Sequence, residues 1–265
     1  MGQVIKVALT GASGRVGRVL TEALLGDERF HVVGAVDRVG VGQEIRSGKN
    51  NITIEPDLEG IFSRFRPQVM VDFTSAEAAR ANFRLALAYR VRPVVGTTGF
   101  TLADLDEFHS LCETQQIGAI VAPNFAIGAI LMMHFASLAA RYFNSVEIIE
   151  LHHDGKKDAP SGTALKTAEI IAHAQAREEG APNGRESEST PGCRGGCFQG
   201  IPIHSVRLPG LVAHQEVIFG GTGQTLSIRH DTTSREAFVP GVVMAIQKVM
   251  EINRFVYGLE ELMEL

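Results

Sequence analysis

The chain lacks the features that mark secreted, membrane-spanning or nucleic-acid-binding proteins. Its 265 residues include only 3 cysteines, too few for the paired disulfide framework of a small secreted domain. The net charge of -5, from 25 basic and 30 acidic residues, gives no electrostatic reason to bind a nucleic-acid backbone. No apolar run approaches the roughly 20 residues that a membrane-spanning helix needs. We therefore expect neither nucleic acid nor a membrane among its partners.

The start of the chain favours a cytoplasmic protein. A strand-like run begins at Val4, which leaves no room for a signal peptide, and Lys6 stands where a myristoylation signal would need serine or threonine. A hydrophobic content of 45% predicts a folded protein with one large or two medium domains. We therefore expect a soluble protein of the cytoplasm.

Two of the three cysteines, Cys193 and Cys197, lie close together in TPGCRGGCFQG, which suggests a metal or redox site. A structural zinc site normally has four ligands, and no obvious second pair accompanies these two. The alternative is a pair of free thiols within the polar, glycine-rich stretch 179–200, which is expected to be a mobile loop. The sequence favours this alternative, so no metal site is predicted.

The first half of the chain opens with the parts of a phosphate-binding βα unit. The β-branched run 4–9 leads directly into TGASGRVG and then into a helical pattern that continues to Leu24. Gly11 permits a tight turn, Gly14 lets backbone approach a pyrophosphate, and Gly17 lets the helix lie close to the strand. The helix start offers unpaired N–H groups to the phosphate. On its own, the spacing GxxGxxG would also suit an ordinary tight turn.

A second apolar run, 31–36, strengthens this interpretation because it ends on an acidic residue. Asp37 lies about 20 residues after Gly17, where a carboxylate accepts hydrogen bonds from the adenosine ribose hydroxyls. Arg38 follows directly and could instead pair with a 2′-phosphate. The two neighbours favour different dinucleotides, so we expect both NADH and NADPH to be used.

Strand and helix patterns continue to alternate through the first half. Strands are predicted at 68–73, 93–95 and 117–122, and helices at 76–89 and 101–115. Such alternation is typical of a parallel sheet with helices on both faces, whose ligands lie beyond the carboxyl ends of the strands. Three turns follow these strands and are expected at the nicotinamide side of the cleft, although helix capping is the commoner use of Thr and Asn there. They contain Phe73, Thr74, Gly96, Thr97, Thr98, Pro123, Asn124 and Phe125.

The second half has strands in series, which predicts an α+β domain with a mixed, mainly antiparallel sheet. A long apolar helix is expected at 127–142, and a final helix at 235–255 is expected to return to the first domain. The fold class is therefore α/β, with a Rossmann-type dinucleotide-binding domain at 1–126 and 233–265 and a second domain at 127–232. The strands predicted for the second domain are 146–151, 203–208, 212–219 and 225–230.

The stretch ELHHDGKKDAPSGTA, residues 150–164, carries the densest titratable chemistry in the chain. Ser161 is a good helix N-cap, so the N–H groups of Gly162 and Thr163 would form an anion site at a helix start. Lys156 adds a cation, and two adjacent histidines can donate hydrogen bonds. The alternative is a polar surface on which Asp158 neutralises a lysine. The combination favours a small anionic substrate, most simply a carboxylate, over zinc, for which HExxH spacing is absent.

These motifs, together with DFT, GTTGF, APNFAIG and HSVRLPGLVAHQEVIFGGTGQTLSIRHDTTSR, run in order along nearly the whole chain. In them the sequence resembles the 4-hydroxy-tetrahydrodipicolinate reductase family, also called dihydrodipicolinate reductase. The element HHxxKxDAPSGTA is highly specific, whereas TGASGxxG is shared by many Rossmann proteins. The cysteine-containing loop has no counterpart that we can assign to the family.

The resemblance implies hydride transfer from NADH or NADPH to a cyclic, unsaturated imine dicarboxylate, releasing water and tetrahydrodipicolinate, in lysine biosynthesis through diaminopimelate. By motif position, His152 resembles the histidine proposed as catalytic and Lys156 the lysine proposed as proton donor; which of them gives the proton stays open. His153, Lys156, Gly162 and Thr163 would hold the substrate carboxylates. A homotetramer built through the sheet of the second domain is also implied. The complete predicted cofactor site comprises Gly11, Ala12, Gly14, Arg15, Val16, Gly17, Asp37, Arg38, Phe73, Thr74, Gly96, Thr97, Thr98, Pro123, Asn124 and Phe125.

Two rival functions fit the sequence less well. A short-chain dehydrogenase needs Tyr-x-x-x-Lys, but no lysine stands four residues after Tyr89, Tyr142 or Tyr257. A non-catalytic NAD(P)H-sensing Rossmann protein would keep the glycine turn, yet it would have no use for the cationic stretch 152–163.

Overall fold

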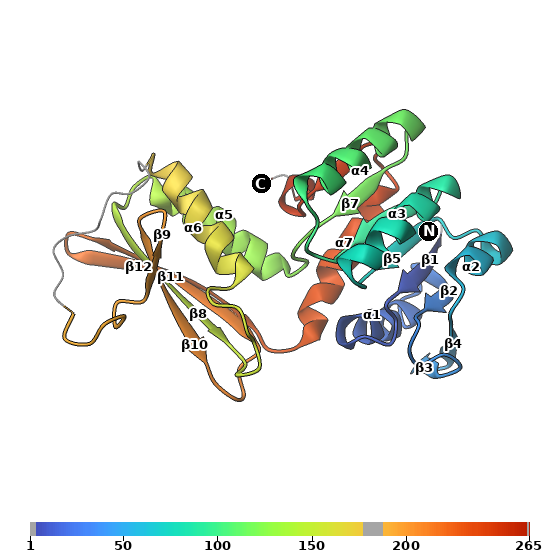
Figure 1. The fold of residues 1–265 in the computed structure, drawn as a ribbon, viewed down its shortest axis with the longest axis horizontal. Coiled ribbons are helices and arrows are strands. Elements are labelled where there is room, and N and C mark those ends of the chain that lie inside the picture. Colours follow the sequence, from blue (N-terminus) through green and yellow to red (C-terminus); the bar gives the residue numbers. More distant parts are fainter. Residues whose placement is uncertain (1–3, 177–187, 264) are drawn as a thin grey trace. The chain divides into compact units, whose positions relative to one another are not determined.

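The structure, a computed structural model, describes residues 4–176, 188–263 and 265 (Figure 1). The chain divides into two compact units, one holding Met1–Ile127 and Arg235–Leu265 and the other Gly128–Ser234. The first unit contains an 8-stranded sheet and the second a 5-stranded sheet. The predicted fold class, a Rossmann-type α/β unit followed by an α+β unit with a mixed sheet, is confirmed.

The 8-stranded sheet is parallel except at one edge, where β3 and β4 pair antiparallel. Its central strands are buried along most of their length, and they read as continuous apolar runs because helices cover both faces. In order across the sheet, the strands are β13 (Phe255–Tyr257), β7 (Ala119–Val121), β6 (Arg92–Val95), β5 (Val69–Asp72), β1 (Ile5–Thr10), β2 (Phe30–Val36), β4 (Asn50–Glu55) and β3 (Glu44–Ser47).

Three of the α-helices of this unit begin at a side chain that caps the first turn. Asp57 and Ser75 each accept an N–H of the first turn, and Thr101 forms a reciprocal capping box with Asp104. In chain order, the α-helices are α1 (Arg15–Leu25), α2 (Leu58–Phe65), α3 (Ala76–Ala88), α4 (Leu102–Gln115) and α7 (Val239–Val249), with 3₁₀ helices η1 (Arg235–Phe238) and η2 (Glu260–Leu262).

The register of the parallel strands brings their carboxyl ends together. Thr10 lies opposite Val36 on one side and Asp72 on the other, and Asp72 lies opposite Val95. The turns after β1, β2, β5 and β6 therefore leave the sheet at one edge, which is where a Rossmann-type sheet binds its ligand.

The second unit packs two helices, α5 (Ile127–Ala140) and α6 (Gly162–Ala174), on one face of the 5-stranded sheet. Only β8 and β10 pair in parallel; the other three pairings are antiparallel. Along β8 the helix-covered face changes from apolar, at Val146 and Ile148, to polar, at Glu150 and His152. Across the sheet the strands are β12 (Gln224–Thr232), β11 (Ala213–Gly221), β8 (Ser145–His152), β10 (Ile201–Arg207) and β9 (Gly196–Phe198).

Two sequence predictions are wrong at element boundaries. The final helix does not run from 235 to 255: η1 precedes it, α7 ends at Val249, and the next residues turn into β13, which pairs with β7. The apolar run FVY fits a buried parallel strand, and the pattern alone could not separate it from a helix end. In the predicted loop 179–200, Gly196–Phe198 pairs with β10, while 179–187 lie outside the described residues.

Candidate active site

The turn after β1 can be built only with glycine at two positions. Gly11 has φ +77, and a Cβ there would lie 2.3 Å from the carbonyl oxygen of Phe73. A Cβ on Gly17 would lie 2.0 Å from the carbonyl oxygen of Gly11. Gly17 therefore lets the helix lie against the turn, whereas the sequence predicted a close approach to the strand.

Most amides of this turn are bound within the protein, which defines those that remain for a ligand. The N–H groups of Gly11 and Ala12 donate to Val36, and that of Gly14 donates to Gly11. The next two amides, on Arg15 and Val16, are the first of α1 and have no partner within the helix. The positive end of the helix dipole adds to them, so an anion is expected at this point.

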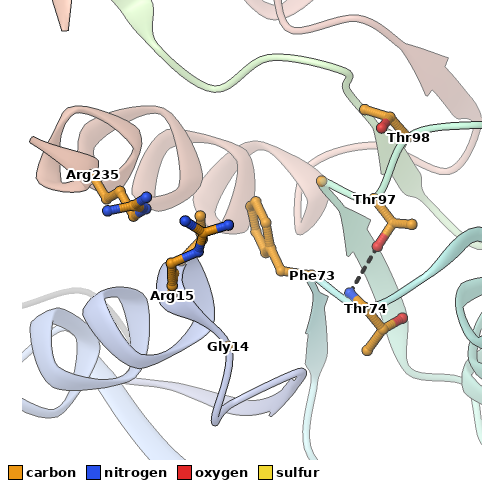
Figure 2. A pocket seen from close by; sticks show the side chains of 9 residues that line it. Gly14, Arg15, Phe73, Thr74, Thr97, Thr98 and Arg235 are labelled. Atoms are coloured by element: carbon orange, nitrogen blue, oxygen red, sulfur yellow. Dashed lines mark hydrogen bonds between the residues drawn. The ribbon is translucent and has the colours of Figure 1, made fainter. Parts of the chain in front are cut away.

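A pocket of about 330 Å³ opens at this helix start (Figure 2). Figure 2 shows the guanidinium groups of Arg15 and Arg235 pointing into the same space from α1 and η1. Neither group has a hydrogen-bond or ion-pair partner among the residues that the structure describes, so the pocket carries two uncompensated positive charges. The residues around it are Gly14, Arg15, Val16, Phe73, Thr74, Gly96, Thr97, Thr98 and Arg235.

A buried carboxyl group holds the far wall of this pocket in place. Asp72 has 0% of its surface exposed and accepts hydrogen bonds from Thr10 and Asn82 at 2.8 and 2.7 Å. It also accepts from the amide and hydroxyl of Thr74, at 3.0 and 2.7 Å, and from the hydroxyl of Thr97, at 2.9 Å. The Thr97 hydroxyl in turn accepts the Thr74 amide (Figure 2). The turns after β5 and β6 are thus fixed to one side chain.

Asp37 is placed at the end of β2, as its sequence position predicted. Its Oδ2 accepts the amide and hydroxyl of Ser13 at 3.0 and 2.6 Å, and its Oδ1 accepts the amide of Val39 at 3.1 Å. Partial burial raises the pKa of Asp37, but these hydrogen bonds outweigh burial and the net pKa is lowered. The group remains an ionised acceptor tied to the glycine turn. Arg38 beside it is exposed.

The other predicted cofactor residues lie outside the lining of this pocket. Ala12 and Gly17 are buried beneath the turn. Asn124 accepts the amide of Ala126 at 2.9 Å, which forms an Asx turn just before α5 and leaves both the capping and the cofactor role predicted from the sequence untested. Phe125 is buried, with its ring 5.6 Å from that of Phe73. Phe125 therefore supports a pocket residue without lining the pocket. Pro123 is exposed.

In the second unit, a fully buried glutamate organises the end of β8. Glu150 is 0% exposed and receives both terminal nitrogens of Arg207, at 2.9 and 2.8 Å. It also contacts His152 Nδ1 at 2.5 Å and accepts the amide of Ser161 at 3.3 Å. Burial raises the pKa of Glu150, but the hydrogen bonds from Arg207, Ser205 and His152 outweigh it and leave the net pKa lowered.

His152 lies half-buried between this glutamate and two cations. Burial lowers its pKa most, the hydrogen bond and charge of Glu150 oppose burial, and the charges of Lys156 and Arg207 lower the pKa further. The net pKa lies below that of an ordinary histidine, so His152 is mainly neutral at neutral pH. A neutral imidazole at this place can accept a proton.

The ammonium of Lys156 is held by a carboxylate in this structure. Its Nζ lies 2.8 and 2.7 Å from the two oxygens of Asp158, whose pKa is lowered chiefly by this hydrogen bond. The neutralising role of Asp158, which the sequence offered as an alternative, is thus observed. The lysine side chain is 20% exposed and that of its partner 63%, so the pair is open to exchange with an incoming carboxylate.

The predicted helix start is confirmed. Ser161 caps α6 by accepting the amide of Ala164 at 3.2 Å. The amides of Gly162 and Thr163 are the first of the helix and have no partner within it. Deeper in the same helix, Thr167 donates to the Thr163 carbonyl at 2.7 Å, which fixes the first turn from below. His153 is partly buried in the loop that leads to this turn.

Sequence reasoning missed several residues that build these sites. Glu150 had a usable signal, because a charged residue stands at a position of β8 where the alternation of Val146 and Ile148 predicts an apolar one. Arg207 and Arg235 had none: each reaches its site through tertiary packing from a distant part of the chain. Ser13 and Asp72 stood inside quoted motifs but were assigned no role.

Two family models together match almost the whole chain. The model described as dihydrodipicolinate reductase, N-terminus, matches residues 5–125, and the model described as dihydrodipicolinate reductase, C-terminus, matches residues 128–263. The two matches meet between Phe125 and Gly128, next to the point where the structure divides into its two units.

Relatives and solved structures agree with these matches. The 4-hydroxy-tetrahydrodipicolinate reductase of Moorella thermoacetica is 59% identical over 264 residues, covering 98% of each chain. That of Geobacillus kaustophilus is 51% identical over 98% of this chain and 99% of its own. A structure of dipicolinate-bound dihydrodipicolinate reductase from Paenisporosarcina sp. TG-14 aligns with a TM-score of 0.88 and 44% identity, covering 98% of this chain and 99% of that chain.

The parallel sheet, the glycine turn and the cationic pocket define a Rossmann-type oxidoreductase that uses a nicotinamide cofactor. The chain belongs to the dihydrodipicolinate reductase family, and it is an NAD(P)H-dependent 4-hydroxy-tetrahydrodipicolinate reductase of the lysine and diaminopimelate pathway. An amine dehydrogenase from Mycobacterium smegmatis shares the fold alone, with a TM-score of 0.67 and 12% identity over 97% of this chain and 96% of that chain.

The described part of the chain contains neither a cluster of metal ligands nor a membrane-spanning helix. No group of three or more His, Cys, Asp or Glu side chains there could hold a metal ion. Cys193 and Cys197 are exposed free thiols, and Cys112 is buried, which raises the pKa of its thiol to about 12. No helix in residues 4–176 and 188–263 is long and apolar enough to cross a membrane.

The two guanidinium groups of the pocket should contribute to cofactor affinity. We expect Arg15→Ala and Arg235→Ala each to raise the Kd of NADH and NADPH by roughly 10- to 100-fold, because each removes a charge-assisted hydrogen bond worth about 1.5 to 3 kcal/mol. Fluorescence titration of the dinucleotide measures this. Arg18→Ala is the matched control, since Arg18 lies on the same helix and pairs with Glu22 at 3.2 Å. Unchanged affinity in both pocket variants would contradict the assignment.

Proposed function

We propose that the chain reduces its cyclic imine dicarboxylate by binding the nicotinamide cofactor at the start of α1 and the substrate carboxylates at the start of α6. The observation that carries this proposal is the chemistry of the second unit. There, the unpaired amides of Gly162 and Thr163 stand in one short loop and helix start with an exchangeable lysine and a neutral histidine. A protein that only sensed the cofactor would need none of these groups.

The first unit is suited to hold a dinucleotide. The amides of Arg15 and Val16 and the guanidinium of Arg235 fit the phosphates. Asp37, with acceptor capacity left after its three hydrogen bonds, fits the ribose, and exposed Arg38 fits a 2′-phosphate. The cofactor, when bound, supplies the hydride. We assign both NADH and NADPH. The nicotinamide side is assigned to the turns with Phe73, Thr74, Gly96, Thr97, Thr98 and Asn124.

The second unit is suited to hold two carboxylates. One carboxylate fits the amides of Gly162 and Thr163, and the other fits His153 and Lys156 once the lysine leaves Asp158. The Paenisporosarcina relative binds dipicolinate, a flat ring with two carboxylates, which supports this class of ligand for the present chain.

His152 and Lys156 divide the proton chemistry between them in this proposal. Release of water from the hydroxylated ring needs a base to take a proton from carbon and an acid to protonate the departing hydroxyl. Reduction then needs one hydride and one further proton. Neutral His152 is suited to accept a proton, and the Lys156 ammonium is suited to donate one. We therefore assign Lys156 as the proton donor and His152 as its basic partner.

We further propose a homotetramer located in the cytoplasm. Within the second unit, no described helix covers the face of the 5-stranded sheet opposite α5 and α6, and this face presents Ile149 and Ile218 beside Glu147 and His204. Such an open face with apolar side chains suits contact with another copy of the chain.

Removing either proton-handling group should abolish most of the turnover. We expect His152→Ala and Lys156→Ala to lower kcat on the order of 10²- to 10⁴-fold, while the Kd of the cofactor changes little. The assay follows oxidation of the dinucleotide, coupled to the enzyme that forms the unstable substrate. Lys157→Ala is the matched control, because this neighbouring lysine is exposed and has no assigned role. Near-normal turnover in both site variants would refute the assignment.

Arg38 should distinguish the two cofactors. We expect Arg38→Ala to raise the KM for NADPH by roughly 10-fold and to leave the KM for NADH nearly unchanged, because only NADPH has a 2′-phosphate to pair with. Steady-state kinetics with each dinucleotide at saturating substrate measure the two constants. If both constants stay at their wild-type values, Arg38 does not read the phosphate.

A further inference from the structure

We infer that Glu150 is a positioning residue that decides which nitrogen of His152 carries the proton and also holds the start of α6. A single buried carboxylate would thus align the imidazole with the amides of Gly162 and Thr163. The inference deepens the proposed function and depends on the roles assigned there to these three residues.

Glu150 is fully buried. A carboxylate with 0% exposure is costly unless charge and hydrogen bonds compensate it. Arg207 provides both, with a two-pronged contact at 2.9 and 2.8 Å. Burial works to raise the pKa of Glu150, but its partners keep the net pKa lowered, so the group stays ionised.

The state of His152 follows from that charge. An ionised carboxylate has no proton to donate, so the contact of 2.5 Å between Glu150 Oε2 and His152 Nδ1 requires the proton on Nδ1. In the neutral imidazole, Nε2 then carries the lone pair. This is the nitrogen that a base must offer, and the same contact fixes the plane of the ring.

The other oxygen of Glu150 connects the histidine to the substrate-binding helix. Oε1 accepts the amide of Ser161, the residue that caps α6, at 3.3 Å. Arg207, while bound to this oxygen, also donates to the carbonyl of Asp158 at 2.7 Å. The end of β8, the loop that carries Lys156 and the start of α6 are therefore tied to one ion pair.

The variant Glu150→Gln tests this role because it keeps the shape of the side chain. Its amide oxygen can still accept from Arg207 and Ser161, whereas its NH₂ group would donate to His152 Nδ1 and move the imidazole proton to Nε2. We expect kcat to fall on the order of 10²-fold, with the Kd of NADPH unchanged. Heteronuclear NMR of labelled histidine should report the proton on Nδ1 in the wild type and on Nε2 in the variant.

A pH profile separates positioning from simple support of the fold. The charged groups around His152 are Glu150, Lys156 and Arg207, and only the first favours its protonation. Glu150→Gln should therefore move the acidic limb of kcat/KM to lower pH. A residue with a merely structural role would lower thermal stability without moving this limb.

A matched control variant and the wild-type spectrum keep the inference testable. Glu169→Gln removes a carboxylate from the exposed side of α6, where it pairs with Lys166 at 2.8 Å, and it should behave as wild type. Wild-type kinetics and an Nδ1 proton in Glu150→Gln would overturn the inference and leave the proposed function standing. If that variant does not fold, the wild-type spectrum decides alone, since an Nε2 proton there contradicts the inference. Near-normal turnover in both His152→Ala and Lys156→Ala would instead refute the proposed function.

Discussion

The candidate active site depends on a buried carboxylate that cannot be left without a partner. Glu150 has no solvent to stabilise its charge, so it retains Arg207, His152 and the amide of Ser161 as fixed neighbours. Each neighbour belongs to a different segment of the second unit. Because the buried charge needs these partners, it fixes the relative positions of a strand end, a loop and a helix start.

The first unit also has a buried acid at the end of a strand of its own sheet. Asp72 is also 0% exposed and stands at the carboxyl end of a strand, where five donors from Thr10, Thr74, Asn82 and Thr97 converge on it. Two of these residues, Thr74 and Thr97, line the pocket at the start of α1. In both units, a buried acid holds the polar loops of a candidate site in place through several hydrogen bonds.

The parts of the fold that follow from local pattern were predictable, and those that follow from tertiary contact were not. The run 4–9, the glycines at Gly11 and Gly17, and the cap at Ser161 identify their elements because period, turn and cap are local properties. By contrast, β13 is a strand only because it pairs with β7.

The candidate site likewise contains residues that the local sequence predicts and residues that only tertiary contacts bring in. Eight of the residues predicted at the cofactor site line the pocket, because turns that follow parallel strands must meet at one edge. Arg207 and Arg235 reach their sites from far along the chain, and no spacing rule points to them. The sequence left open whether Asp158 pairs with Lys156, and the structure shows that it does.

A crystal structure with NADPH and dipicolinate tests the central claim most directly. The account predicts carboxylate oxygens within hydrogen-bond distance of the Gly162 and Thr163 amides, with Lys156 released from Asp158. Carboxylates bound away from α6 would contradict it.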